Sequence, residues 1–507
     1  MRTSHPSRLS VASVPLPTAT VLHYLSLGMI IIVGGVLRLT MLRQQSLWFD
    51  EIDVVVRAQR PLDEVLRTFV AAGENGPLYN ILLALWVRLV GVSEIAVRFP
   101  SAVAGILSIP LIYALARRTV GPTTGLFAAG LLAISPYHIW YSQEAKMYTL
   151  VVLLALLSSL ALAEALGRNS RLLWAAYAIA TTLMFYTHVA TVLVFVAQTL
   201  YVVVTRRSWA GRERGWLVAA AVLTLPYVPV ALWAMRVVGG GVSTWHGNIG
   251  LWDAVRTLGV KMAVNRADAA IEVGGALLYA GFAVVGVIVL ARRQGAPRWW
   301  LLIASLAVVP IAGLYLVSLR QSVFSDRYAI VALPAYLLLV SAGVASLVRG
   351  RVSWPLGALA IFLLLAFAWG PIRDINRSEA TQKEDWRSGY ADIARRAEPG
   401  DAMIVHPGYL ITTYEYFQQR EPRLSDYPVA VIPSFAVKWL DEPLMVSMLR
   451  EQLAGATRVW LVQSPDRVPL ADPDQILKGW LAAHGQPLYT YEVNGVSITL
   501  FELDEPL

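Results

Sequence analysis

The sequence predicts a mostly α-helical, polytopic membrane protein with a small soluble α/β domain at its C-terminal end. Of the 507 residues, 56% are hydrophobic and only 15% are charged, whereas soluble domains carry about 25% charged residues. Apolar runs of about 20 residues, the length that crosses a bilayer as a helix, recur up to residue 371. The rest of the chain is polar. We therefore expect a membrane domain over 1–371 and a soluble domain over 372–507.

The apolar runs number eleven, and a further run at 77–91 is shorter, begins at Pro77 and contains Arg88. The first run is too long for the apolar part of a secretory signal, so we expect it to remain as a transmembrane helix. The eleven runs are 21–42, 98–117, 121–140, 148–166, 171–187, 189–205, 215–235, 271–291, 298–319, 327–348 and 352–371.

Arginines mark alternate loops between these runs, for example Arg117-Arg118 and Arg292-Arg293. Because basic loops face the cytoplasm, the pattern places the N-terminus inside and the segment 77–91 in the outer interface. The net charge of +8 then reflects topology rather than nucleic-acid binding. This orientation predicts eleven spans and an exterior C-terminal domain.

The stretch FDEIDVVVRAQRP, residues 49–61, follows the first run on the predicted exterior side. Its apolar residues recur at helical spacing, and Asp50 and Glu51 stand at the start of this short helix. An uncompensated charge so close to a membrane costs several kcal/mol. The two acids must therefore be solvated, paired, metal-bound or engaged in chemistry. The simplest alternative is that Asp50 caps the helix and Asp53 completes a capping box.

Other polar residues are predicted on the same face. Glu74 lies in a turn before 77–91, and Glu144 and Lys146 follow the aromatic stretch SPYHIWYSQ. A Glu near a helix N-terminus is favourable to the helix dipole, which explains Glu144 better than Lys146. In the stretch FSDRY, Arg327 and the nearby Arg320 could form a simple ion pair with Asp326 or bind phosphate.

Two histidines, His188 and His246, lie near this face. Each could be an ordinary interfacial residue, or a metal ligand if carboxylates lie close by. The chain contains no cysteine, so disulfide and thiolate chemistry are excluded.

The soluble domain shows strand-like runs at 402–407 and 458–464 and a helical pattern at 386–397. The dipeptide Asn494-Gly495 stands between two further runs, and it is the strongest short-range signal of a β-hairpin. A small α/β domain follows from these patterns.

Several motifs of the membrane part, in this order and spacing, resemble the bacterial GT-C glycosyltransferases of the protein O-mannosyltransferase-like group, which are related to the lipid A aminoarabinose transferases. The motifs are WFDE, GPLYNILL, SEIAVRFPSAVAG, SPYHIWYSQEAKMYTL, FYTH and FSDRY. Two positions depart from the family pattern. Gly76 replaces the first Pro of a usual Pro-Pro pair. Asn75 stands where the aminoarabinose transferases carry a phosphate-contacting Lys, which weakens the resemblance for that substrate.

The resemblance implies transfer of a sugar from a polyprenyl-phosphate donor to an acceptor hydroxyl on the exterior side of the bacterial plasma membrane, with Asp50 at the position of the family's catalytic carboxylate. We expect Asp50 to act as general base, with Glu51 orienting or assisting it, and direct displacement to invert the anomeric centre. The residues expected to bind the donor phosphate are Lys146, Arg327 and Arg320. Those expected to contact sugar or acceptor are Glu74, Tyr79, Glu144, Tyr148, His188, Trp245 and His246.

Three further expectations accompany this function. A divalent ion such as Mg²⁺, Mn²⁺ or Zn²⁺ could be held by Asp50, Glu74 and His188. The partners are the lipid-linked donor, the bilayer and an acceptor that is a protein, a lipid or a glycan. The alternative function is a transporter or flippase of a lipid-linked sugar, which buried charges near an outward cavity would also suit.

Overall fold

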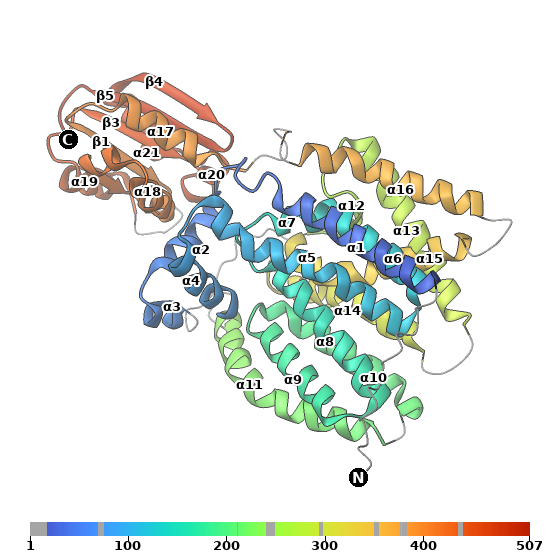
Figure 1. Cartoon of the computed structure of the whole chain (residues 1–507). Helices are drawn as coiled ribbons and strands as arrows, with labels where there is room; N and C mark the ends of the chain where they lie inside the picture. Colours follow the sequence, from blue (N-terminus) through green and yellow to red (C-terminus); the bar gives the residue numbers. More distant parts are fainter. Residues whose placement is uncertain are drawn as a thin grey trace, which may run out of the picture.

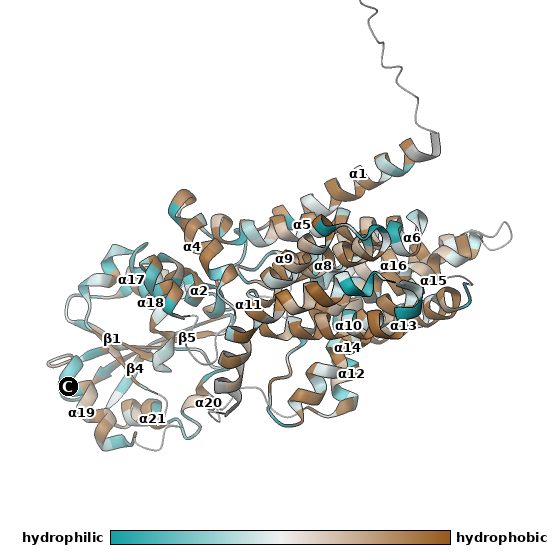
Figure 2. Cartoon of the chain, turned by 90° about the horizontal axis from the view of Figure 1, so that it is seen from below, coloured by the Kyte–Doolittle hydropathy of each residue, from teal (hydrophilic) through white to brown (hydrophobic). Residues whose placement is uncertain are grey.

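The computed structural model describes residues 18–68, 76–209, 211–239, 249–293, 298–348, 354–375, 377, 383–433 and 440–507. A bundle of helices makes up one part, and a five-stranded sheet flanked by helices makes up the other (Figure 1). The bundle is predominantly hydrophobic, whereas the sheet domain is mixed (Figure 2). The predicted fold class, a mainly helical membrane protein with a small α/β domain at its C-terminal end, is confirmed.

Seven helices of the described chain are long and apolar enough to cross a membrane. They are α1 (Thr18–Leu39), α5 (Glu94–Thr119), α8 (Tyr148–Arg168), α13 (Ala269–Ala291), α14 (Trp299–Ser318), α15 (Leu333–Val348) with the preceding 3-10 turn η3 (Asp326–Ala332), and α16 (Trp354–Asp374). The other helices that carry expected runs are α6 (Pro122–Ile134), α9 (Arg171–Phe185), α10 (Val192–Val204) and α11 (Glu213–Gly239). Each expected run therefore lies on helix, while the number of spans stays a prediction.

The run 121–140 is not the single helix that its apolar character suggested. The helix breaks at Ser135, and α7 (Pro136–Ser142) begins with Pro136 at its first position. The side chain of buried Arg38 donates to the carbonyl oxygens of Leu132 and Ala133, both at 2.8 Å. These carbonyls belong to the last turn of α6, where intrahelical partners are missing. A buried cation and a proline together terminate the helix.

Helices α13 and α15 approach each other closely because two glycines meet between them. A β-carbon at Gly286 would collide with the backbone of Leu339, and one at Gly343 would collide with the backbone of Phe282. Small residues allow this close packing of helices within membranes.

Three short helices follow α1, namely α2 (Phe49–Gln59), α3 (Leu62–Thr68) and α4 (Leu78–Val90). The guanidinium of Arg88 on α4 donates to the carbonyl oxygens of Ala58 at 3.0 Å and Arg60 at 2.6 Å, which ties α4 to the end of α2. A helix of 13 residues is only about 20 Å long, less than the roughly 30 Å of a hydrocarbon core. The length of α4 therefore agrees with an interfacial position, which stays a prediction.

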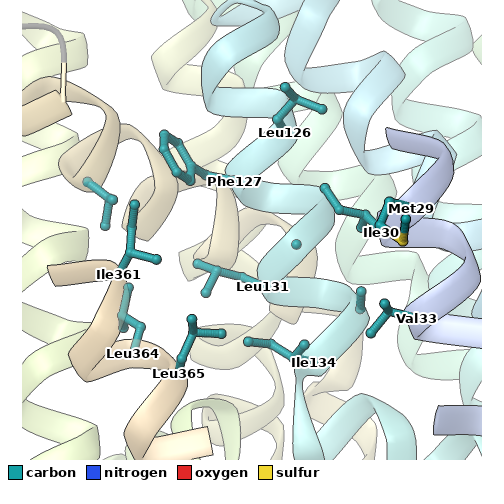
Figure 3. Close-up of a pocket in the computed structure, with 13 residues that line it drawn as sticks. Met29, Ile30, Val33, Leu126, Phe127, Leu131, Ile134, Ile361, Leu364 and Leu365 are labelled. Carbon is teal, nitrogen blue, oxygen red and sulfur yellow. The ribbon is translucent and has the colours of Figure 1, made fainter. Parts of the chain in front are cut away.

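An apolar groove runs between α1, α6 and α16 (Figure 3). Its volume is about 330 Å³, and none of its lining residues is charged. Met29 and Val33 line it from α1, Leu131 from α6 and Leu365 from α16. These side chains give the groove a wall as apolar as lipid.

The C-terminal domain contains one sheet in the order β2-β1-β3-β5-β4. The strands β1 (Asp401–His406), β2 (Val429–Val431) and β3 (Arg458–Gln463) are parallel, and β4 (Gly485–Val493) and β5 (Val496–Leu503) form the predicted hairpin. Gly495 in its turn has φ +70°, a conformation that favours glycine.

Helices cover both faces of this sheet. On one face, Met403 and Val405 of β1 belong to the same hydrophobic cluster as residues of α17 (Trp386–Arg396) and α18 (Ile411–Gln418). The alternate residues Ala402 and Ile404 pack on the opposite side. That side carries α19 (Glu442–Gln452) and α21 (Ile476–Ala483), and the short α20 (Val468–Ala471) follows β3.

The C-terminal domain packs on the bundle next to the N-terminal ends of α2 and α5 (Figure 1). Arg387 of α17 forms an ion pair with Glu94 at 2.9 Å. The hydroxyl of Tyr416 on α18 donates to the carbonyl oxygen of Val92 at 3.2 Å. The backbone N–H of Phe49 donates to Glu384 at 2.9 Å, so the segment leading into the C-terminal domain also touches the start of α2, where Asp50 and Glu51 lie.

Candidate functional site

Helix α2 presents Asp50 and Glu51 in its first turn, and neither residue caps it. The N-cap residue is Trp48, whose side chain makes no capping hydrogen bond. Asp53 pairs with Arg57 at 3.0 Å, one turn further on the same helix. The capping alternative is therefore wrong for both Asp50 and Asp53.

Glu51 is fully buried in a network of charges. Its two carboxylate oxygens accept from Arg98 at 2.9 and 2.6 Å, a bidentate pair in which both side chains are at most 2% exposed. The backbone N–H of Ala145 donates to Oε1 at 2.8 Å, and Lys383 Nζ lies 3.4 Å from Oε2. Burial raises the pKa of Glu51, but Arg98 and Lys383 outweigh it and lower that pKa to about 2.

Lys383 joins this network from the segment that leads into the C-terminal domain. Its ammonium lies 3.6 Å from Glu144 and 5.3 Å from the ring centre of Trp140. Burial lowers the pKa of Lys383, while Glu51 and Glu144 oppose that shift. We name Glu51, Arg98, Glu144 and Lys383 the Glu51 network. It holds α2, α5, the loop after α7 and the C-terminal domain together.

Glu144 lies in the loop 143–147 between α7 and α8, not on a helix as expected. It is 2% exposed, and its Oε2 atom has no hydrogen-bond partner among the described residues. Burial raises its pKa, against the effect of Lys383. Its neighbours make Glu144 a member of the Glu51 network, without direct access to solvent.

Asp50 has a different environment. Its Oδ2 atom accepts from Arg327 Nη1 at 2.8 Å, and the two side chains are 22% and 20% exposed. The Arg327 guanidinium lies over the ring of Trp48, 5.3 Å from its centre. Two motifs distant in the sequence, WFDE and FSDRY, therefore meet at one partly open ion pair.

Lys146 supplies a second positive charge near Asp50. Burial raises the pKa of Asp50, but the charges of Lys146, Arg327 and Arg467 outweigh it, so the pKa lies below its usual range. Asp50 is therefore ionised at neutral pH. Within the described chain, no carboxylate lies within ion-pair distance of Lys146, whose side chain is partly exposed. We name Asp50, Lys146, Arg327 and Arg467 the Asp50 site.

Arg467, in the loop that follows β3, was not expected in the site. Its Nε donates to Glu384 at 2.9 Å, and its guanidinium lies 4.6 Å from the ring centre of Phe49. Glu384 also accepts from the backbone N–H of Phe49 at 2.9 Å. The C-terminal domain therefore reaches the residue next to Asp50.

The other expected residues that the structure describes lie behind or beside this site. The Tyr79 hydroxyl hydrogen-bonds Ser101 Oγ at 2.8 Å, and Ser101 contacts the Lys146 carbonyl oxygen at 2.8 Å, so Tyr79 supports the loop that carries Lys146. Tyr148 is buried beside Arg327 and 6.4 Å from the ring of His188. Arg320 is exposed just beyond the end of α14.

His188 is almost fully buried, 4.7 Å from the ring centre of Tyr328. Its Nδ1 atom accepts from the backbone N–H of Ala190 at 3.1 Å. Burial lowers the pKa of His188 to about 4, so the ring is neutral at pH 7. Glu74, Trp245 and His246 lie outside the described residues.

The expected metal site of Asp50, Glu74 and His188 stays a prediction. Among the described residues, no group of three or more His, Asp or Glu side chains has the arrangement to hold a metal ion. Asp50 is paired with Arg327, and Glu74 is not among the described residues.

A polar cavity of about 630 Å³ lies between α12 (Leu251–Ala263), the start of α13 and the end of α16. Lys261 lines it and forms an ion pair with Asp326 at 3.4 Å. Because Asp326 directly precedes Arg327, this ion pair connects the cavity wall to the Asp50 site.

Comparisons with known proteins bear on the fold and on one segment of the sequence. Residues 74–233 match the profile of the family described as dolichyl-phosphate-mannose-protein mannosyltransferase. No curated protein matches the chain. ArnT from Cupriavidus metallidurans, solved with bound undecaprenyl phosphate, is 15% identical with a TM-score of 0.57, covering 95% of this chain and 98% of that one.

A second group of similar structures comes from the oligosaccharyltransferase AglB of Archaeoglobus fulgidus. The complex with an inhibitory peptide and a dolichol-phosphate is 10% identical, with a TM-score of 0.57, and covers 95% of this chain and 74% of that one. Another structure, which contains Zn and sulfate, is 11% identical with a TM-score of 0.56, over 94% of this chain and 72% of that one. The chain thus has the fold of the GT-C glycosyltransferases, and its segment 74–233 carries the mannosyltransferase-type sequence pattern.

Proposed function

We propose that this protein is an inverting membrane glycosyltransferase, which moves a sugar from a polyprenyl-phosphate donor to an acceptor hydroxyl on the outer face of the plasma membrane. The observation that carries the proposal is Asp50, an ionised and partly exposed carboxylate held between Arg327 and Lys146. The likeness to proteins solved with undecaprenyl phosphate and dolichol-phosphate supports the class of donor.

In the reaction, the acceptor oxygen attacks C1 of the sugar and forms the new C1–O bond. The bond from C1 to the phosphate oxygen breaks, and its electron pair stays on the phosphate. Asp50 takes the proton of the acceptor hydroxyl. Atoms and charge balance, because the phosphodiester of the donor becomes a phosphomonoester with one more negative charge.

Arg327 and Lys146 oppose the charge that develops on the leaving phosphate. Fixed cations that meet charge formed in the transition state are among the strongest catalytic contributions. When the phosphate draws Arg327 away from Asp50, the carboxylate loses one of the charges that lower its pKa. Donor binding thereby makes Asp50 a stronger base.

The Glu51 network has a positioning role in this mechanism. The side chain of Glu51 is 0% exposed and accepts three hydrogen bonds from Arg98 and Ala145, so an acceptor hydroxyl cannot reach it. Glu51 instead fixes the first turn of α2, and with it the backbone of Asp50. Glu74, Trp245 and His246 remain candidates for acceptor or sugar contacts.

The charge distribution supports an outward-facing site. Arg118 ion-pairs with Glu164 at 3.4 Å near the end of α8, and Arg293 donates to the carbonyl oxygen of Val120 at 2.7 Å. These basic groups lie at the opposite ends of α5 and α8 from Asp50, and basic loops face the cytoplasm.

The orientation is testable because the chain contains no cysteine. A cysteine introduced at the exposed Ser425 of the C-terminal domain should react with a membrane-impermeant maleimide in spheroplasts, without lysis. Labelling only after the membrane is opened would place the domain, and the site beneath it, on the inner face.

The function itself is tested with purified full-length protein and a panel of polyprenyl-phosphate sugars. Release of polyprenyl phosphate, detected by mass spectrometry, should occur with one sugar class and fall at least about 10²-fold in Asp50→Asn, the scale of general-base loss. Movement of the lipid-linked sugar across proteoliposomes, with no release of polyprenyl phosphate, would overturn the proposal in favour of a flippase.

A further inference from the structure

The C-terminal domain turns the carboxyl ends of its parallel strands toward the Asp50 site. The loop after β1 carries Tyr409, whose ring lies 5.3 Å from that of Phe49. The loop after β3 carries Arg467, whose guanidinium lies over the same Phe49 ring, 4.6 Å from its centre. In open α/β sheets, ligands bind at this edge of the strands. Here the edge closes against the membrane domain, next to Asp50.

The guanidinium of Arg467 is held by Glu384 through one of its three nitrogens. Glu384 engages its Nε atom at 2.9 Å, which is the inner edge of the guanidinium. Among the described residues, Arg467 makes its hydrogen bond to a carboxylate through Nε, and its terminal nitrogens donate no hydrogen bond to Glu384. The side chain is 21% exposed, so a ligand can reach it.

The positive charges around Asp50 come from three separate parts of the chain. Lys146 stands in the loop between α7 and α8, Arg327 in η3, and Arg467 in the C-terminal domain. A single positive charge is enough to balance the one negative charge of the Asp50 carboxylate. A phosphate group presents several oxygens and up to two negative charges, and guanidinium groups bind such an anion through paired hydrogen bonds.

We propose that Arg467 is a substrate-binding residue that contacts the phosphate of the lipid donor together with Arg327 and Lys146, so that the C-terminal domain completes the donor site of the membrane domain. The inference rests on the proposed function, because it takes the polyprenyl phosphate as the ligand. It goes further in giving the soluble domain a direct contact with that ligand.

A purely structural role for Arg467, as a link between the two domains, is the competing explanation. Arg387 offers a matched control, because it also joins the domains through an ion pair, with Glu94 at 2.9 Å. Arg387 pairs with Glu94 rather than with Asp50. If Arg467 were only a link, replacing either arginine should have similar effects.

The test measures binding of polyprenyl phosphate to the full-length protein in nanodiscs, with polyprenol, which lacks the phosphate, as the reference ligand. Arg467→Ala should weaken binding of polyprenyl phosphate about tenfold or more, as expected for a lost hydrogen bond between charged groups. It should leave polyprenol binding unchanged. Arg467→Lys should restore part of the affinity, and Arg387→Ala should bind as the wild type does.

Two outcomes overturn the inference. Wild-type affinity in Arg467→Ala would remove Arg467 from the phosphate site, and equal losses in Arg467→Ala and Arg387→Ala would leave only a domain link. A wild-type protein that does not prefer polyprenyl phosphate over polyprenol would instead contradict the proposed function itself. The two failures are therefore distinguishable.

Discussion

Asp50 and Glu51 are neighbours in one helical turn, yet their surroundings differ in almost every physical respect. Glu51 is 0% exposed, and both of its oxygens are taken by Arg98, Ala145 and Lys383. Asp50 is 22% exposed and, among the described residues, forms an ion pair with Arg327 in a region with surplus positive charge. A saturated carboxylate stabilises structure, whereas a carboxylate with room for a further ligand can take part in chemistry.

The largest expected effect is a loss of stability when one charge of the Glu51 network is removed. Glu51→Gln leaves Arg98 buried without its anion, and losing one partner of a buried ion pair costs about 3–5 kcal/mol. We expect a strongly lowered melting temperature of the purified protein, or failure to accumulate in the membrane.

Asp50→Asn serves as the control in that experiment and should melt close to the wild type. If Glu51→Gln were as stable as the wild type but inactive, Glu51 would be a reacting group, and the contrast between the two acids would be lost.

The next effect in size follows from the proposed role of Asp50 as general base. Asp50→Asn keeps the shape of the side chain but removes the base, so the turnover number should fall by about 10²-fold or more. The matched variant Asp53→Asn, one turn along α2 and ion-paired with Arg57, should retain activity. Turnover of Asp50→Asn at the wild-type rate would reject the role of Asp50.

Smaller effects are expected from the cations of the Asp50 site. Lys146→Ala and Arg327→Ala should each weaken donor binding by about tenfold, since a hydrogen bond to a charged group contributes about 1.5–3 kcal/mol. Arg327→Lys should recover only part of the loss, because lysine cannot form a bidentate contact. Titrating the donor into the purified variants measures the affinity. Unchanged affinity in both Ala variants would mean that the phosphate binds elsewhere.

The smallest effect concerns pH. The charges of Lys146 and Arg327 hold the pKa of Asp50 below its usual value of 3.8, so the base is already ionised through the neutral range. Protonation should reduce kcat/KM only as the pH falls below that value. Removing one charge with Lys146→Ala should move this acidic limb to higher pH, and a shift to lower pH would contradict the charge assignment.

The sequence indicates where the helices and the motifs lie, but not which side chains form ion pairs with Asp50 and Glu51. The motif WFDE led to Asp50 and FSDRY led to Arg327, and the structure joins them at 2.8 Å. Arg98, at the start of an apolar run, carried a signal that could have been used, since a buried arginine requires an anion. Lys383 stands in a short connecting segment, and no pattern in the sequence marks it.

The sequence by itself determined the helices and the hairpin of this protein, because both depend on local properties. Hydrophobic length sets where a helix can lie in a membrane, and Asn494-Gly495 favours the tight turn between β4 and β5. Which carboxylate is buried, and which remains open, was decided by the tertiary structure alone. That choice depends on Arg98, Arg327, Lys383 and Arg467, which reach α2 from distant parts of the chain. Electrostatic free energy depends on distances in space and on burial, and neither can be read from the order of the residues.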